Sequence, residues 1–321
     1  MTDGDVAPAA APRPSEDSAP PLAHATLVAL STYFVLVWGA GFVATRIALQ
    51  YAAPFSYIGI RYSIALVVAL LAFGHGARWP QSTRQWGHVA VAGLLSHAGY
   101  LGGSHYAQRL GLSAGVTALI LALQPLLTAL IVSRWLHERL APTQRVGIAV
   151  GLAGVALVVG ERALAGTASA ASLGAIVVSL LCVTAGTLYQ REFCAETDLR
   201  AAVCIHFAAT AAVMLPLGVV VEGFDIHWNG VVAAALVYHV VLASIGAYSI
   251  LHLLMRHGQA TGVTSLLYLT PSVAALVEWA FFRVAPSATM WLGMAVACVG
   301  VAMTSVVGAR FARGTLIEER S

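Results

Sequence analysis

The sequence predicts an all-α membrane protein with ten transmembrane helices, arranged as two inverted five-helix repeats around a central cavity. Three observations predict it: an apolar composition, ten apolar stretches of spanning length, and motifs of the first half that return in the second. Of the 321 residues, 59% are hydrophobic and 10% are charged, and the mean hydropathy is +0.81. Soluble domains carry about 25% charged residues, so water is not the main solvent of this chain.

The apolar stretches are bounded by charged residues, proline or glycine, and each is close to the roughly 20 residues that cross a bilayer. Short connections between them predict antiparallel neighbours. The third and eighth stretches are diluted by His, Gly and Ser, which is typical of helices that face a polar cavity. The expected spans are residues 26–47, 54–74, 87–107, 113–133, 143–160, 172–191, 201–221, 230–252, 261–282 and 287–308.

These spans divide the chain into two units and three connecting or flanking segments. Residues 26–160 are expected to form the first five-helix repeat and residues 172–308 the second, with residues 161–171 as an external linker. Residues 1–25 are rich in Pro and Ala, a composition that cannot bury enough apolar surface to fold. We expect a disordered cytoplasmic tail there, without the pattern of a signal peptide, and a second cytoplasmic tail at residues 309–321.

The arginines predict the orientation in the membrane, because basic loops stay in the cytoplasm. All 17 basic residues are Arg. With the N-terminus inside, twelve of them lie on the cytoplasmic side, four lie outside (Arg46, Arg109, Arg162 and Arg283), and Arg61 lies within the second span. The distribution predicts a multi-pass protein of a bacterial-type inner (plasma) membrane with both termini in the cytoplasm.

Motifs of the first half return in the second half at a nearly constant offset. Pro125 matches Pro271, and Arg46 matches Arg191. Five helices is an odd number, so the second copy enters the membrane upside down, and inverted repeats place two half-sites around an axis near the midplane. Two longer segments recur as well: residues 111–117 (GLSAGVT) as 258–264 (GQATGVT), and residues 147–156 (GIAVGLAGVA) as 293–302 (GMAVACVGVA).

Several of these motifs resemble the drug/metabolite transporter superfamily, EamA type. They are W-G-A-G-F-V-A-T-R at residues 38–46, Arg61, the run from Tyr100 to Thr128, and Glu138-Arg139. The resemblance covers about residues 26–308 and implies ten helices in two inverted repeats and the export of small metabolites such as amino acids.

The second half departs from the family pattern at one acid. Where a counterpart of Glu138 is expected, the sequence reads F-R-V at residues 282–284, and an acid stands inside the span at Glu278. A carboxylate so deep in a span costs several kcal/mol unless it finds a partner or water. Arg61 lies at a similar depth, so the two are candidates for an ion pair. One interpretation is coupling or gating, and the other is a static tie between helices.

Two histidines stand near the middle of equivalent helices: His97 in the third span and His239 in the eighth. Imidazole titrates near neutral pH, so these side chains can line a cavity and relay protons or bind a carboxylate. The alternative is a hydrogen-bonded packing role. His105 and His252 lie nearer the helix ends and are expected to be interfacial, and His206 is expected to be structural.

Four aromatic side chains lie at similar depth: Trp38, Tyr100, Tyr248 and Tyr268. They can form an apolar chamber with hydroxyl groups, which suits an aromatic or aliphatic amino acid. Ordinary packing is the alternative for some of them.

Helix breaks are expected at Gln124 and Pro125 in the fourth span, and at Pro271 in the ninth. Proline frees a carbonyl one turn back, which a neighbour, water or ligand must satisfy. Breaks at corresponding places in two halves are typical of transport sites, so Gln124 is a candidate substrate contact. A plain kink is the alternative.

Other patterns limit the function. There is no G-x-x-x-x-G-K-[ST] loop for ATP, and no H-E-x-x-H, G-x-S-x-G or acidic metal cluster. We therefore expect that the protein binds no metal or cofactor and is not an enzyme. A net charge of +3 without a basic stripe argues against a nucleic-acid partner. The four cysteines lack C-x-x-C spacing and are interpreted as free packing thiols.

The expected function is a secondary transporter that exports small metabolites, such as amino acids or related compounds, by alternating access, with a monomer sufficient. Proton coupling and uniport are both compatible with the residues. The alternatives are a carrier of nucleoside-like or sugar-like solutes, a membrane-embedded enzyme that uses His97, His239 and Glu278, and a structural membrane protein without a polar cavity.

Overall fold

The computed structural model describes residues 24–135, 140–247 and 268–318, together with Ile250 and Leu253. Within these ranges the chain is helical apart from its loops and one isolated β-bridge between Ala52 and Ile226. That bridge joins the loop after the first helix to the loop after α9. Tyr248 and His252 lie outside the described residues, as do residues 261–267 of the ninth expected span.

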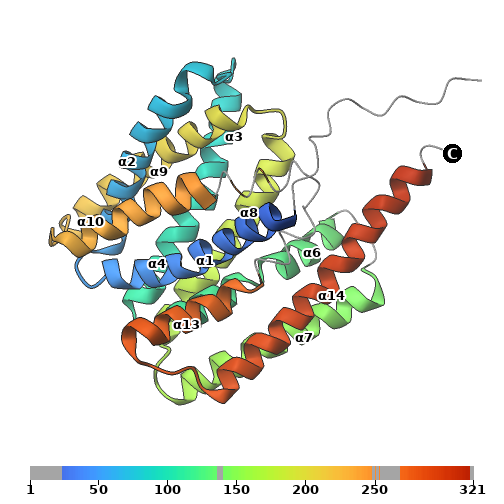
Figure 1. Cartoon of the computed structure of the whole chain (residues 1–321). Helices are drawn as coiled ribbons and strands as arrows, with labels where there is room; N and C mark the ends of the chain where they lie inside the picture. Colours follow the sequence, from blue (N-terminus) through green and yellow to red (C-terminus); the bar gives the residue numbers. More distant parts are fainter. Residues whose placement is uncertain (1–23, 136–139, 248–249, 251–252, 254–267, 319–321) are drawn as a thin grey trace, which may run out of the picture.

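The helices form a bundle in which the chain turns back after most of them (Figure 1). Their bounds are α1 His24–Ala48, α2 Pro54–Phe73, the 3₁₀ turn η1 Gly74–Gly76, α3 Thr83–Gly93, the π-helical η2 Leu94–Gly99, α4 Tyr100–Arg109, α5 Ala114–Leu121, α6 Gln124–Trp135, α7 Pro142–Leu164, α8 Ala170–Phe193, α9 Leu199–Glu222, α10 Gly230–Val237, the π-helical η3 Tyr238–Ala247, α13 Thr270–Phe282 and α14 Ala288–Glu318.

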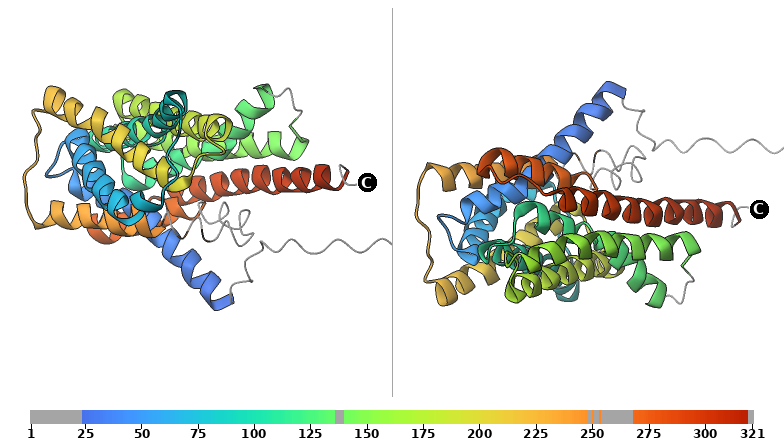
Figure 2. Two further views of the ribbon diagram at one scale, coloured as in Figure 1. Left: turned by 90° about the horizontal axis from the view of Figure 1, so that it is seen from above. Right: turned by 90° about the horizontal axis from the view of Figure 1, so that it is seen from below.

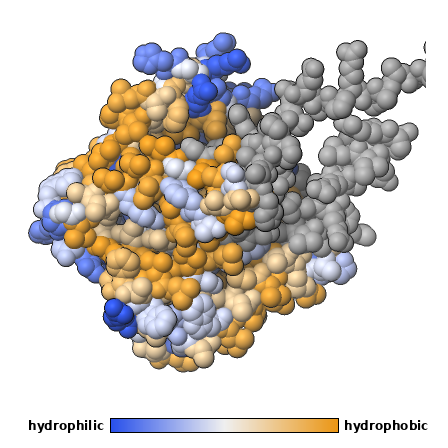
Figure 3. Space-filling view, in the orientation of Figure 1, coloured by the Kyte–Doolittle hydropathy of each residue, from blue (hydrophilic) through white to orange (hydrophobic). Residues whose placement is uncertain are grey.

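The chain is an all-α, multi-pass membrane protein. Seven helical segments of the described ranges are long and apolar enough to cross a bilayer. Large apolar side chains point away from the bundle along these helices, for example Leu71, Val220 and Leu181, which are 78%, 83% and 50% exposed. Apolar surface accordingly spreads over most of the face seen in Figure 3. Ten spans and inverted repeats stay predictions.

Two of the expected spans are irregular. The third is α3, η2 and α4 in direct succession, and the eighth begins as α10 and continues as η3. Each π-helical segment contains the histidine noted in the sequence, His97 in η2 and His239 in η3. π-helical turns are rare and occur frequently at functional sites. They add a residue to a turn without changing hydropathy, so the apolar pattern predicts only plain helices here.

The fourth expected span is two helices, α5 and α6, joined by a turn at Ala122 and Leu123. Pro125 lies in the first turn of α6, and Pro271 in the first turn of α13. A first turn tolerates proline because its N–H groups have no partner inside the helix. Both prolines therefore mark where a helix begins.

Several other helix starts are fixed by a side chain that accepts hydrogen bonds from the first-turn N–H groups. These capping residues are Ser82, Ser113, Ser169, Asp198 and Asn229. The helix boundaries thus follow from local sequence.

The scaffold is built from helices that pack in pairs. α7 runs alongside α14, as Figure 2 shows from two sides, and α2 packs on α9. Small residues bring the first pair close: a Cβ added at Gly154 of α7 would stand 2.5 Å from the Ala297 nitrogen and 2.6 Å from the Gly293 carbonyl of α14. The small-residue stripes of these helices are therefore contact surfaces inside one chain. α1 lies across the bundle between α13 and η3.

All four cysteines are free thiols. Cys194 follows the last residue of α8, and its burial raises the pKa of the thiol. It therefore stays protonated at neutral pH, which suits a packing role.

Gly154→Ala should destabilise the protein by about 1–3 kcal/mol, because the added methyl group meets backbone that cannot move aside. Gly160→Ala on the same helix is the matched control: its Cβ meets nothing within 4 Å, and alanine favours the helix by up to about 1 kcal/mol. Thermal unfolding in detergent compares the two. Equal melting temperatures would contradict the close α7–α14 packing.

Candidate functional site

A cavity of about 330 Å³ lies in the middle of the bundle. Side chains of α1, α2, η2, α4, α6, α8, α9 and η3 line it, so both halves of the chain contribute. Its size is in the range of sites that hold a small molecule.

The cavity wall combines aromatic and polar side chains. Its basic residues are Arg61 and four histidines, and the described lining residues include no Asp or Glu. Five of the residues singled out in the sequence as substrate contacts lie in this wall: Trp38, His97, Tyr100, Gln124 and His239. Gln124 at the start of α6 donates from Nε2 to the Thr187 hydroxyl of α8 (2.8 Å).

Three expectations from the sequence differ from the structure. Tyr268 is 6% exposed and packs in the apolar cluster around Leu119 and Met294, away from the cavity. His105 is 2% exposed and lines the cavity, so the interfacial expectation is wrong. His206, expected to be structural, also lines it. Depth along a helix was the signal used, and depth alone does not say which face of the helix carries the residue.

Two buried tyrosines of α2 hold the π-helical histidines. The Tyr57 hydroxyl lies 2.7 Å from His239 Nδ1, and the Tyr62 hydroxyl lies 3.0 Å from His97 Nδ1. His239 Nε2 faces the Thr45 hydroxyl at 3.3 Å on α1. These contacts join α1, α2, η2 and η3 beside the cavity, and neither tyrosine was recognised from the sequence. Tyr57 stands one helical turn before Arg61 and Tyr62 directly follows it, and this proximity to a charge inside a span was the available signal.

Glu278 does not pair with Arg61. Its carboxylate forms an ion pair with Arg46 of α1 and accepts the N–H groups of Ala114 (2.9 Å) and Gly115 (3.0 Å) at the start of α5. The guanidinium of Arg46 also lies over the Phe282 ring at 4.3 Å. A helix N-terminus attracts a carboxylate through its free N–H groups and dipole. Glu278 is thus a cap shared by three helices.

Arg61 lies instead in the cavity wall. It is 7% exposed, and its Nη2 donates to the Ser244 hydroxyl of η3 at 3.3 Å. The ring of Tyr62 is 5.3 Å from its Cζ.

A second carboxylate cap was missed in the sequence. Glu222, the last residue of α9, accepts the N–H groups of Phe55 (3.0 Å) and Ser56 (2.8 Å) at the start of α2. The residue before this helix, Ala53, has no side-chain acceptor. A helix that begins at proline, with no capping side chain before it, was the available signal.

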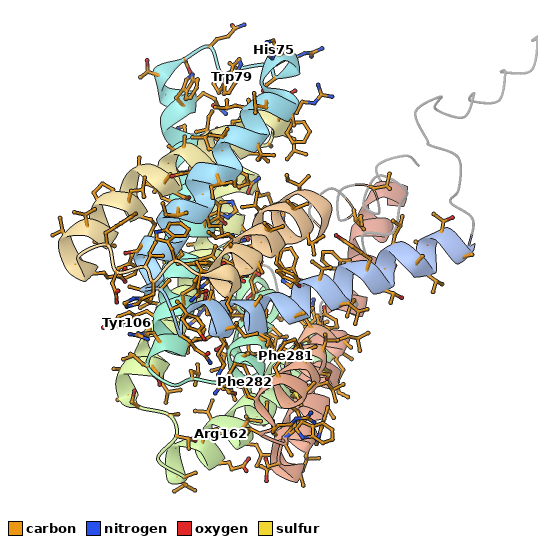
Figure 4. All side chains as sticks on the ribbon, turned by 60° about the vertical axis from the view of Figure 1, so that its left-hand side comes forward. His75, Trp79, Tyr106, Arg162, Phe281 and Phe282 are labelled. Carbon is orange, nitrogen blue, oxygen red and sulfur yellow. The ribbon has the colours of Figure 1, made fainter. Side chains whose placement is uncertain are left out.

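The two ends of the cavity differ. Towards the ends of α1 and α13, the Thr45–His239–Tyr57 contacts and then the Arg46–Glu278 pair close the bundle. In the other direction the lining reaches Gln190 and Val203, next to the connection between α8 and α9. Figure 4 shows Phe282 and Tyr106 on the closed side, with His75 and Trp79 at the far end of the molecule.

Comparison with known proteins identifies relatives over most of the chain. A family model described as the EamA-like transporter family matches residues 26–160 and again residues 171–306. A crystal structure that is 21% identical superimposes with a TM-score of 0.62, covering 89% of this chain and 99% of that one. The likeness shows a shared fold.

Three curated relatives are named as transporters or exporters. The uncharacterized transporter YvbV of Bacillus subtilis (strain 168) is 25% identical over 261 residues, 79% of this chain and 83% of that protein. The uncharacterized inner membrane transporter YedA of Escherichia coli (strain K12) is 26% identical over 84% of this chain and 88% of its own. A protein of Streptantibioticus cattleyicolor, named a probable terminal-alkyne amino-acid exporter, is 26% identical over 83% of this chain and 89% of its own.

Tyr57→Phe should destabilise the protein by about 1–2 kcal/mol, because it removes a fully buried hydroxyl and leaves His239 with one partner fewer. Tyr106→Phe is the control, since Tyr106 is 43% exposed and stacks on Phe55 through its ring, which phenylalanine keeps. Unfolding in detergent measures both, and the control should change by less than about 0.5 kcal/mol. A larger loss in the control than in Tyr57→Phe would contradict this role.

Proposed function

Because this chain belongs to the EamA-like transporter family, we propose that it is a secondary transporter that exports small metabolites, with amino acids or related compounds as substrates. The observation that carries the proposal is the cavity of about 330 Å³ in the middle of a membrane bundle, lined from both halves of one chain. Since one chain supplies the whole lining, a monomer suffices for transport.

The aromatic and amide lining supports the substrate class. Trp38, Tyr100 and Phe42 offer apolar faces, and Gln124 offers an amide, as a small amphipathic solute requires. A relative named as a probable amino-acid exporter shares 26% of its residues with this chain.

Inverted repeats with ten spans are part of the proposal. The family model matches each half separately. The helices that pack closely are those the repeats would make equivalent, α2 with α9 and α7 with α14. The third and eighth expected spans each contain a π-helical segment with a histidine. Packing of equivalent helices is what a pseudo-twofold axis through the cavity produces.

The arginine distribution supports cytoplasmic termini, which places the closed end of the cavity outside and the end near Gln190 towards the cytoplasm. The conformation then faces inward, ready to load solute for export. We assign the external gate to Glu278 and Arg46. The tyrosine–histidine pairs at His97 and His239 are the groups through which protons would couple to transport.

Reconstitution into liposomes tests the function. Purified protein should move radiolabelled leucine or phenylalanine down a gradient, and the solute should emerge chemically unchanged. An imposed pH gradient should accelerate this movement if protons are coupled, and leave it unaltered in uniport. Empty liposomes are the control. Transport of nucleosides or sugars instead of amino acids would contradict the substrate class, and chemical conversion of the solute would contradict the transporter.

Glu278→Gln should weaken the external gate. Arg46 keeps partial access to water, with 32% of its side chain exposed, so the lost ion pair costs roughly 1–3 kcal/mol. We expect a lower melting temperature and a several-fold lower rate of export, because the inward-facing state is no longer held closed on the outside.

Glu192→Gln is the matched control, since Glu192 is exposed in the last turn of α8. A melting temperature lowered in Glu278→Gln with an unchanged export rate would make the pair a static tie and contradict the gate.

A further inference from the structure

Arg61 is a buried charge with few partners. Only 7% of the residue is exposed, and its Nε has no hydrogen-bond partner among the described residues. Its Nη2 bond to Ser244 is 3.3 Å long, to a neutral hydroxyl. A guanidinium carries five N–H donors and stays protonated in proteins, and a buried charge without a counter-charge is costly.

The acidic side chains near the cavity already have partners. Glu278 is held by Arg46 and the start of α5, and Glu222 by the start of α2. Neither lines the cavity. Nothing in the described wall therefore neutralises Arg61, and the missing negative charge must enter with the solute.

Other unsatisfied nitrogens lie in the same wall. His105 Nε2 and His206 Nε2 are buried and have no partner within the described part of the chain. Both residues line the cavity together with Arg61. A neutral imidazole can present an N–H from such a nitrogen. Both imidazole nitrogens are shielded from the open space of the cavity, so Arg61 is the group in this wall that is left to hold an anion.

We propose that the cavity recognises its substrate through one carboxylate group docked on Arg61, and that it offers no counter-charge to an ammonium group. The preferred substrates are then monocarboxylic acids with an uncharged remainder, favoured over free amino acids and over amines. From the proposed class of amino acids and related compounds, this inference selects the related carboxylic acids that lack the ammonium group, and it rests on the proposed transport function.

A carboxylate suits the site better than a phosphate. One guanidinium balances one negative charge, and its fork matches the two oxygens of a carboxylate. A phosphate monoester carries nearly two charges at neutral pH, and the described wall holds no second permanent cation. The uncharged remainder of the solute would lie against Trp38, Phe42 and Phe207.

Calorimetry on the purified full-length protein tests the proposal. The three ligands share one branched carbon skeleton and differ in their charged groups. Isocaproate has the carboxylate alone, leucine has carboxylate and ammonium, and isoamylamine has the ammonium alone. We expect isocaproate to bind most tightly, leucine less tightly and isoamylamine least, with roughly tenfold or more between the first and the last. The aromatic series of hydrocinnamate, phenylalanine and phenethylamine should give the same order.

Any reversal of that order overturns the proposal, as does tighter binding of isoamyl phosphate than of isocaproate. Failure of both isocaproate and hydrocinnamate to bind at millimolar concentration also overturns it. These comparisons use the unaltered protein, so they test recognition of a carboxylate without relying on the folding of any variant.

Substitutions test whether Arg61 is the group that binds the carboxylate. Arg61→Gln should weaken isocaproate binding roughly tenfold or more, whereas Arg61→Lys should weaken it less and keep the order of acid over amine. Arg109→Gln removes a guanidinium that is exposed at the end of α4 and outside the cavity, and it should leave the affinity unchanged. An unchanged affinity in Arg61→Gln overturns the proposal. If that variant does not fold, the lysine variant decides by keeping or losing the order.

Flux measurements separate this inference from the proposed function. Arg61-dependent binding of isocaproate without movement of any solute would uphold the carboxylate site and refute transport. Movement of leucine without preference for the acids would uphold transport and refute the site.

Discussion

Hydrocarbon offers no hydrogen bonds, so each polar group inside a membrane bundle must be satisfied by the protein itself or by a water-filled cavity. Two carboxylates in this chain satisfy such groups in the same way, by accepting hydrogen bonds from the free N–H groups at a helix start. Glu278 holds the first N–H groups of α5, and Glu222 holds those of α2. Each carboxylate comes from a helix far away in sequence, so each cap also fixes how two helices sit against one another.

The cavity is where the described residues leave this constraint unmet. Around it Tyr57 and the backbone satisfy His239, and Tyr62 satisfies one nitrogen of His97. Arg61 Nε and the Nε2 atoms of His105 and His206 are buried and have no partner among the described residues. The bundle thus separates a wall that is held by internal partners from a wall in which the charge of Arg61 is not balanced by an acid. A binding site in a membrane needs that second kind of wall, because a fully satisfied surface has no reason to take up a polar solute.

Much of the fold could be predicted from the sequence, because apolar length and capping residues are local properties. The acid at Glu278 was also recognised from its depth in a span. Its partner was not, since depth favoured Arg61 over Arg46, whereas the pairing depends on which helices are neighbours. α13 packs beside α1, and α2 packs beside α9, and neither pairing is encoded in periodicity. Tyr268 was misplaced for a related reason: it precedes the first turn of α13, where the helix start decides which way it faces.

The closed end depends on one helix. Thr45 and Arg46 are consecutive in α1, and consecutive residues of a helix point about 100° apart. Thr45 therefore reaches His239 of η3, while Arg46 reaches Glu278 of α13. The same helix contributes Phe42 and Trp38 to the cavity, about one and two turns earlier. In the proposed transport cycle, a solute that displaces the middle of α1 would act on both closing contacts together, because a helix transmits movement along its axis. Opening of the proposed gate would then follow occupancy of the cavity without any separate signal between the two sites.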